Sequence, residues 1–275
     1  CKIIRMKSCI TISLVPSLSG GPWVLWDNIE TSLRIAAEKG FDGVELFTSG
    51  PSIDSAKPLG HLLQQNNLSL AAVGTGAGKV LHGLTLTDAD PSIRKKAKDF
   101  IKGIINFGAE NSAPSILGSM QGSSTDDFPR ETALKYLRDA LEDLGEYSTS
   151  LGTFFIYEPL NRYETNLFNH FGQACDFARN LETQGVKVLA DLFHMNIEEA
   201  DIASSISDHN DMLGHVHFAD SNRKPIGYGH TDMLPISECL KKINYQGYIS
   251  AEAFAWPDPL TAAQQTIDSF RKFFN

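Results

Sequence analysis

The sequence predicts an α/β protein built as a single (β/α)8 barrel that covers residues 1–275. Short apolar or β-branched runs alternate with longer amphipathic stretches, eight such pairs follow one another, and no linker or low-complexity tract interrupts them. Eight strand–helix units of this length favour a closed parallel barrel over a doubly wound open sheet. The Gly-rich stretch 74–78 lacks the GxGxxG spacing of nucleotide-binding open sheets, and we interpret it as a flexible loop.

Each predicted strand is a short run of apolar and β-branched residues bounded by turn-forming residues. The predicted strands cover residues 9–14, 43–47, 69–73, 113–117, 153–158, 186–191, 213–218 and 248–252. In a closed parallel barrel their carboxyl ends meet at one rim, which is where barrel enzymes place their active sites.

A helix is expected after each strand, because the intervening stretches repeat apolar residues with helical spacing. The expected helices cover 28–39, 59–66, 92–107, 130–151, 171–183, a stretch after residue 197, 235–243 and 259–274. Gly40 stands where it can end the first of them, and Pro91 stands where a first helical turn tolerates proline.

Composition and net charge argue against a membrane span and against nucleic acid as a binding partner. No stretch of about 18 apolar residues occurs, so no membrane-spanning helix is predicted. The formal charge of −9 disfavours nucleic acid, because phosphate binding requires clustered Lys and Arg.

The four cysteines form no CxxC pair, which is typical of reduced thiols in a cytoplasmic protein; they are Cys1, Cys9, Cys175 and Cys239. Because Met6 follows so closely, the first residues are interpreted as a processing remnant, and acylation of Cys1 stays an alternative.

Four consecutive predicted strands end in a side chain that can bind a metal ion. These side chains are Glu158, Asp191, His217 and Glu252. Side chains alternate along a strand, so each shares the barrel interior with the residue two before it. Neighbouring strands lie about 5 Å apart, so the four side chains are expected to converge on one ion.

The predicted ligand set is rich in oxygen and carries about three negative charges before a cation binds. Three carboxylates and one imidazole favour Mn²⁺ or Mg²⁺, with Mn²⁺ as our first choice and Co²⁺ or Zn²⁺ as alternatives. A single glutamate at a strand end is commonly explained by a salt bridge. Four in-phase ligands on consecutive strands are not explained by packing, so a shared divalent metal site is predicted.

Four segments resemble the xylose isomerase-like sugar isomerase and epimerase superfamily, and within it they are most similar to the ketose 3-epimerases of the D-tagatose and D-psicose type. The segments are 158–164 (EPLNRYE), 191–199 (DLFHMNIEE), 215–223 (HVHFADSNR) and 247–252 (GYISAE). The run 40–46 (GFDGVEL) also resembles the second strand of that family. The resemblance is strong from about residue 155 to residue 254 and weak before residue 110.

The resemblance implies roles for individual residues. The metal ligands that it implies are Glu158, Asp191, His217 and Glu252. It implies that Glu158 and Glu252 are the catalytic acid/base pair, that His194 and Arg223 hold hydroxyls at the carbonyl end of the substrate, and that Glu164 binds near O1. Trp23 and Trp26 could close over the sugar, but neither is assigned.

This chemistry suits the residues independently of the resemblance. Inverting a carbon next to a ketone requires removal of a proton from carbon, and a cation that binds the carbonyl stabilises the charge that develops. Two carboxylates on opposite faces can then remove and return a proton. Together with the resemblance to ketose 3-epimerases, this chemistry implies C3 epimerisation of a small-molecule ketose, and our hypothesis is that Glu158 and Glu252 exchange roles with the direction of reaction.

Other functions fit the same barrel. They are a 1,2-isomerase such as hydroxypyruvate isomerase, a 3-dehydroshikimate dehydratase-like lyase, and a sugar-binding barrel without catalysis. An endonuclease IV-like function is disfavoured by the ligand set and the acidic charge. The absence of a phosphate-binding loop favours free ketoses over sugar phosphates, and a homodimer or homotetramer is expected by analogy.

Several residues also have structural interpretations. His194 could cap the following helix, Arg223 could form an ion pair with Asp220 or Asp232, and Glu164 could bind backbone amides in its loop. Glu45, on the second predicted strand, could either contact a residue of the metal site or form a salt bridge inside the barrel. His215, two residues before His217, is expected to be a core histidine with its hydrogen bonds satisfied.

Overall fold

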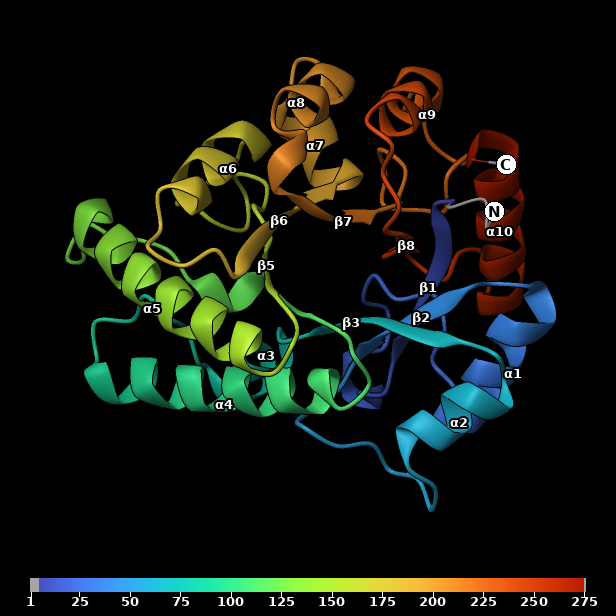
Figure 1. The fold of residues 1–275 in the computed structure, drawn as a ribbon, viewed down its shortest axis with the longest axis horizontal. Coiled ribbons are helices and arrows are strands. Elements are labelled where there is room, and N and C mark those ends of the chain that lie inside the picture. The colour runs from blue at the N-terminus through green and yellow to red at the C-terminus, as the bar shows by residue number, and fades with distance from the viewer. Residues whose placement is uncertain (1–4, 275) are drawn as a thin grey trace.

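The computed structural model describes residues 5–274 and shows a closed barrel of eight parallel strands in chain order, with β8 paired to β1 (Figure 1). The strands are β1 (Lys7–Ser13), β2 (Gly43–Phe47), β3 (Ser69–Gly74), β4 (Ser115–Leu117), β5 (Phe155–Tyr157), β6 (Val186–Asp191), β7 (Leu213–His217) and β8 (Tyr248–Ala251). The predicted barrel is confirmed. Cys1 and its alternative acylation lie outside the described residues.

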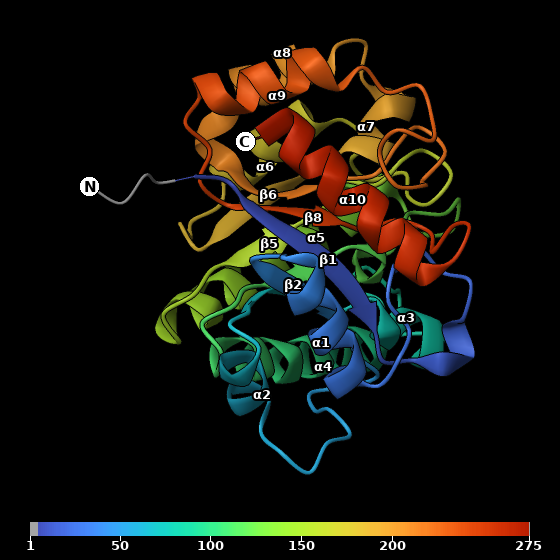
Figure 2. The same ribbon diagram turned by 90° about the vertical axis from the view of Figure 1, so that its right-hand side faces the viewer.

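Helices surround the barrel, and α10 lies beside both α9 and α1, which completes the outer ring (Figures 1 and 2). They are α1 (Ile29–Lys39), α2 (Leu59–Gln65), α3 (Ala77–His82), α4 (Pro91–Ala109), α5 (Arg130–Ser150), α6 (Phe171–Arg179), α7 (Leu192–Glu198), α8 (Ile202–Asp208), α9 (Met233–Lys242) and α10 (Pro259–Phe274). Among the described helices, none combines the length and the apolar character that crossing a bilayer requires.

The predicted helix ends have recognisable local causes. Asn28 precedes α1 and accepts a hydrogen bond from the Thr31 amide, and Gly40 ends the helix with a φ of 85°. Asp90 caps α4 by accepting from the Ser92 amide, with Pro91 in the first turn. These short-range interactions explain why both helices were located from sequence.

Two short helices were not predicted. The interpretation of 74–78 as a loop is wrong at its end, because α3 begins at Ala77. There, Gly78 lies so close to Met120 and Phe100 that a Cβ atom would clash with them, so packing against other elements helps to hold this six-residue helix. The second helix, α7, begins directly after Asp191, although helical pattern was expected only after residue 197.

The strand register brings the ends of β6 and β7 level at the rim. Leu189 is paired with His215 and Asp191 with His217, after a one-residue shift between Val188 and Leu189. Without this shift, the alternating side chains of the two strands would point to opposite sides of the sheet. The shift therefore places both sets of side chains inside the barrel.

Candidate active site

The structure brings together the four side chains that were predicted to share a metal ion. They are Glu158, Asp191, His217 and Glu252, and one ligand atom from each lies within 4.8 Å of the corresponding atoms of the others. Asp191 and His217 are the last residues of β6 and β7, whereas Glu158 and Glu252 each follow the last residue of a strand. All four therefore lie at the carboxyl-terminal rim of the barrel.

His217 lies in the middle of this group. Its Nδ1 atom is 3.1 Å from Asp191 Oδ2, 3.3 Å from Glu158 Oε1 and 3.7 Å from Glu252 Oε2. Its Nε2 atom points the other way and lies 3.1 Å from Glu45 Oε1. A carboxylate that accepts from Nε2–H leaves the Nδ1 lone pair free to bind a metal ion.

Glu45 also contacts a second histidine below the site. Its Oε2 atom lies 2.8 Å from Nε2 of His215, which is buried, as expected for a core histidine with a partner. Burial by itself would raise the pKa of Glu45, but His217 and His215 outweigh it and hold that pKa well below its usual value. Glu45 is therefore an ionised carboxylate that supports His217 from inside the barrel.

Asp191 divides its two oxygen atoms between structure and site. Oδ1 accepts hydrogen bonds from the backbone amides of Phe193 and His194 and caps α7, whereas Oδ2 faces His217. The cap is the reason that a helix starts immediately after the strand. It also means that the alternative of His194 as the cap is wrong, since Asp191 performs that role.

The electrostatics of the four side chains fit a bound cation. Burial, followed by the charges of Glu252 and Asp191, raises the pKa of Glu158 to about 8, although His217 opposes the shift. Burial would lower the pKa of His217, but Glu45, Glu252 and the other carboxylates raise it well above its usual value. Within residues 5–274, Glu158 Oε1 is buried and makes no hydrogen bond. A divalent cation would neutralise these carboxylates and give that oxygen a partner.

Arg223 reaches the site from the loop after β7. Its Nη2 atom lies 2.7 Å from Glu252 Oε2, and Nη1 lies 3.6 Å from Glu164 Oε1. The alternative ion pairs with Asp220 and Asp232 are wrong, because Asp220 binds backbone amides of its own loop and Asp232 caps α9. Arg223 thus connects a predicted acid/base residue with a predicted substrate residue.

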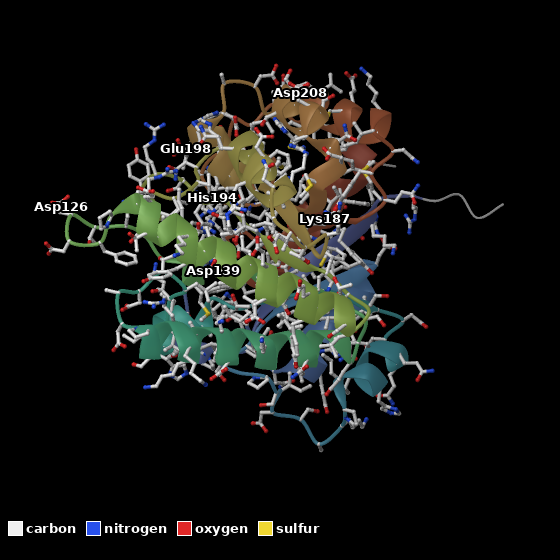
Figure 3. The ribbon with its side chains drawn as sticks, turned by 60° about the vertical axis from the view of Figure 1, so that its left-hand side comes forward. Asp126, Asp139, Lys187, His194, Glu198 and Asp208 are labelled. Atoms are coloured by element: carbon white, nitrogen blue, oxygen red, sulfur yellow. The ribbon has the colours of Figure 1, made fainter. Side chains whose placement is uncertain are left out.

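His194 and Glu164 lie next to the metal-type ligands. The His194 side chain is buried on α7, with Nε2 3.9 Å from Asp191 Oδ2. In Figure 3, His194 lies nearer the middle of the molecule than Glu198 of the same helix. Glu164 accepts from the side-chain amide of Asn161 at 3.1 Å and, among residues 5–274, receives no backbone amide hydrogen bond, contrary to the structural alternative. Burial lowers the pKa of His194, so its ring is neutral.

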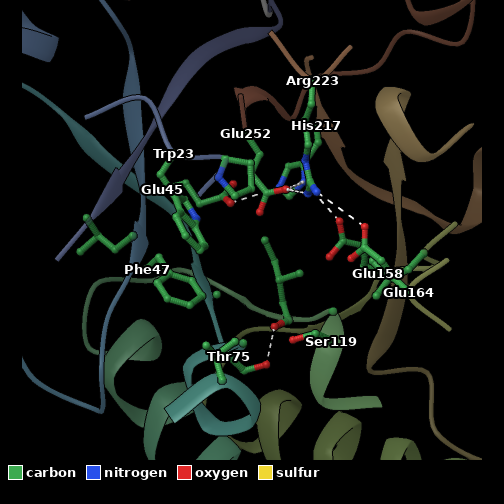
Figure 4. Close-up of a pocket in the computed structure, with 18 residues that line it drawn as sticks. Trp23, Glu45, Phe47, Thr75, Ser119, Glu158, Glu164, His217, Arg223 and Glu252 are labelled. Carbon is green, nitrogen blue, oxygen red and sulfur yellow. Dashed lines mark hydrogen bonds and ion pairs between the residues drawn. The ribbon is translucent and has the colours of Figure 1, made fainter. Parts of the chain in front are cut away.

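A cavity of about 220 Å³ opens over the group. Figure 4 shows Glu158, Glu164, His217 and Arg223 on one side of it, with Trp23 and Phe47 across the cavity and Thr75 and Ser119 at a further edge. Glu45 lies beside Trp23 in this view. Trp26 does not line this cavity, and its Nε1 atom donates to the Trp23 carbonyl. Pattern alone could have found Phe47, because it lies two residues after Glu45 and shares its face. Thr75 and Ser119 gave no such signal.

Known proteins are similar to this chain over much of its length. A model of the family described as "Xylose isomerase-like TIM barrel" matches residues 33–273. D-psicose 3-epimerase of Ruminiclostridium cellulolyticum is 31% identical over 227 residues, which cover 79% of this chain and 75% of that protein. 3-Dehydro-D-guloside 4-epimerase of Escherichia coli is 37% identical over 134 residues, which cover 48% of this chain and 51% of that protein.

Solved structures give the same picture of the fold. The apo form of 3-keto-D-glucoside 4-epimerase from E. coli superposes with a TM-score of 0.78 at 25% identity, covering 98% of this chain and all of that one. The matched relatives are epimerases, so the predicted enzyme class, an isomerase, is confirmed.

Proposed function

Because the chain belongs to the xylose isomerase-like TIM barrel family, we propose that it is a divalent-metal-dependent sugar epimerase that inverts C3 of a free ketose. The observation that carries the proposal is the convergence of Glu158, Asp191, His217 and Glu252 within 4.8 Å of one another. Two of these side chains are glutamates that can act on carbon as well as on an ion.

We propose that the same four side chains hold the ion. Three carboxylates and one imidazole suit Mn²⁺ first, and Mg²⁺, Co²⁺ or Zn²⁺ as alternatives. When bound, the cation would supply Lewis-acid polarisation of the substrate carbonyl. Glu45 supports the set by binding the far nitrogen of His217.

Glu158 and Glu252 perform the proton transfers in this proposal. One carboxylate removes the proton from C3 and becomes a carboxylic acid, and the other, already protonated, gives its proton to the opposite face of the same carbon. Without a cation, burial and neighbouring negative charge raise the pKa of Glu158 to about 8, so this carboxyl group can carry a proton at neutral pH in the metal-free site. Arg223 binds Glu252 at 2.7 Å and keeps that carboxylate in place.

The substrate is held by its carbonyl end. Arg223, Glu164 and His194 surround the metal-type ligands and offer donors and acceptors to the hydroxyl groups there. Of the residues that line the described cavity, Arg223 is the only arginine or lysine, and it is already paired with Glu252 and Glu164. That pairing supports an unphosphorylated sugar as the substrate.

Deuterium exchange from solvent tests the proposal. The protein, with added Mn²⁺, is incubated with a panel of ketoses in D₂O, and incorporation at each carbon is read by NMR. We expect exchange at C3, and Glu158→Gln or Glu252→Gln should reduce its rate by roughly 10³-fold or more. Glu131→Gln, on the exposed first turn of α5, is the matched control and should exchange at the wild-type rate. Full exchange in either active-site variant refutes the pairing.

A second candidate is epimerisation at C4 of a 3-keto sugar. It is favoured by the similarity to the 4-epimerase of E. coli, and the same pair of glutamates would serve, because C4 is next to a ketone at C3. The panel should therefore include a 3-keto-glucoside. Exchange at C4 of that compound, with none at C3 of any ketose, would replace the first candidate with the second.

A further inference from the structure

The ring of His194 can carry its proton on only one nitrogen. The backbone amide of Asn161 donates to Nδ1 of His194 over 3.3 Å, and a backbone amide cannot accept in return. Nδ1 must therefore present its lone pair. In the neutral ring the proton is then on Nε2.

The Asn161 side chain reinforces this state. Its Oδ1 atom accepts from the Tyr163 amide at 3.0 Å, which turns the NH₂ group toward the site. That NH₂ group lies 2.8 Å from His194 Nδ1 and 3.1 Å from Glu164 Oε1. One buried amide therefore contacts two of the proposed substrate-binding side chains.

A separate interaction ties the Asn161 loop to the helix that carries His194. Arg162 donates from its backbone amide, at 2.7 Å, and from its guanidinium, at 2.8 Å, to the carboxylate of Glu198 on α7. Asn161 and His194 thus belong to segments that are fixed to each other. The contact between them does not depend on the conformation of a free loop.

Nε2 of His194 is buried and makes no hydrogen bond within the described chain, because Asp191 Oδ2 lies 3.9 Å away, beyond hydrogen-bond distance. A buried N–H without an acceptor is costly, so its position beside the metal-type ligands indicates that a bound molecule supplies the acceptor. Glu164 presents the opposite polarity, a carboxylate that accepts from a hydroxyl.

We propose that Asn161 is a positioning residue, which holds His194 as the Nε2–H tautomer and Glu164 as its neighbouring acceptor. The pair then fits the carbonyl end of a sugar, where one oxygen accepts from His194 and an adjacent hydroxyl donates to Glu164. The inference rests on the proposed function, because it takes both side chains as substrate contacts. The hydrogen bonds of the Asn161 side chain go to Glu164, His194 and Tyr163, and none of them goes to one of the four metal-type ligands.

NMR of protein labelled with ¹⁵N-histidine tests the tautomer directly. The His194 signals are assigned by comparison with His194→Gln, and we expect a protonated Nε2 and an unprotonated Nδ1 in the wild type. A proton on Nδ1 of the wild-type ring overturns the proposal. This measurement needs neither turnover nor an Asn161 variant.

Asn161→Asp changes the polarity of the side chain at constant size. Its carboxylate would stand at the shorter contact to Nδ1, 2.8 Å against 3.3 Å for the backbone amide, and would therefore outcompete that amide, so we expect the His194 proton to move to Nδ1. We expect kcat/KM to fall about tenfold or more, with unchanged affinity for Mn²⁺. An unchanged tautomer in a folded Asn161→Asp protein contradicts the proposal.

Asn169→Asp is the matched control. The Asn169 side chain donates to the carbonyls of Leu160 and Thr165 in the same loop and makes no hydrogen bond to His194 or Glu164. Its variant should leave the His194 tautomer unchanged, and a shift as large as that of Asn161→Asp would mean that loop disturbance alone is the cause. If the tautomer is as expected but no sugar exchanges deuterium, the proposed function fails and the role of Asn161 in the tautomer stands.

Discussion

The two halves of the barrel mouth are built differently. From β5 to β8, the cavity is bordered by charged side chains at or next to strand ends, namely Glu158, His217 and Glu252. From β1 to β4, Glu45 is the only charged side chain among the described lining residues, and the rest are mainly aromatic, small, aliphatic or hydroxyl-bearing. Some of these, such as Phe47, belong to strands, whereas Trp23 and Ser119 come from connecting segments. Strand register fixes the first set, whereas loop conformation fixes part of the second.

This difference separates two requirements. Proton transfer and ion binding tolerate little displacement, and strands hold side chains in place more precisely than loops do. Recognition of one sugar rather than another depends on the shape of the opposite wall, which loops can vary. We therefore expect variants of the β5–β8 half to change ion binding and chemistry, and variants of the β1–β4 half to change substrate affinity.

The largest effect is expected at the centre of the charged half. His217→Gln removes the only nitrogen of the proposed ligand set and leaves three carboxylates facing one another, so affinity for Mn²⁺ should fall roughly 100-fold or more by calorimetry. Trp256→Ala, at a partly exposed position, is the control and should bind Mn²⁺ as the wild type does. Wild-type affinity in His217→Gln would mean that the ion lies elsewhere.

Gly118→Ala tests how closely the two halves meet. A Cβ atom at Gly118 would lie 2.5 Å from Glu158 Oε2, so the carboxylate must move. Because displacement of a catalytic group by about 1 Å can reduce a rate roughly 100-fold, we expect a large fall in kcat with the fold retained. Gly50→Ala is the matched control, since a Cβ there would have no atom of the described part of the chain within 4 Å. Equal activity of both variants would show that the Glu158 carboxylate can move away from a Cβ at position 118 without loss of catalysis.

The fold and the charged half could be predicted because their signals are local. Each strand is a short apolar run, and Asp191 and His217 end such runs directly. Glu158 and Glu252 were predicted as the last residues of their strands but lie one residue beyond the observed strand ends. Both side chains still point into the site, as the strand alternation predicts. The other half gave weaker signals, since α3 is only six residues long and packs against residues distant in sequence, such as Met120.

Asn161 shows a second limit of sequence reasoning. It lies between predicted site residues in the 158–164 run, yet only the structure shows that its amide faces both His194 and Glu164. The orientation of an amide depends on partners from several segments, and spacing does not reveal it.

A smaller effect is expected in the β1–β4 half of the barrel mouth. Trp23→Ala removes an aromatic surface that lies against Phe47, with ring centres 4.1 Å apart, and borders the cavity. We expect KM for the ketose to rise roughly tenfold from lost apolar contact, with Mn²⁺ affinity unchanged. A loss of Mn²⁺ binding in this variant would contradict the separation between the two halves.

The smallest effect concerns the loop that carries Arg223 into the charged half. The Asp220 carboxylate accepts hydrogen bonds from backbone amides of its own loop, including those of Ser221, Gly227 and Thr231. Burial by itself would raise the pKa of Asp220, but these hydrogen bonds outweigh burial and lower that pKa below its usual value. A lowered folded-state pKa stabilises the fold above the unfolded pKa of about 3.9, and that contribution is lost as pH falls through the folded value.

Thermal unfolding of metal-free protein at pH 6 and at about pH 3 measures this contribution. Asp220→Asn should lower Tm by a few degrees at pH 6, and the difference from the wild type should shrink at the acidic pH. An equal difference at both pH values would show that the charge of Asp220 contributes nothing to the loop.

The most direct test of the metal site is a crystal structure of the protein grown with Mn²⁺, with the ion located by its anomalous scattering. We predict a single ion about 2.0–2.4 Å from Glu158, Asp191, His217 and Glu252. Glu45, His215 and His217 also lie close enough together to hold an ion. An ion bound by those three residues, or no ion at the rim, would contradict the assignment of the two glutamates to metal-assisted proton transfer.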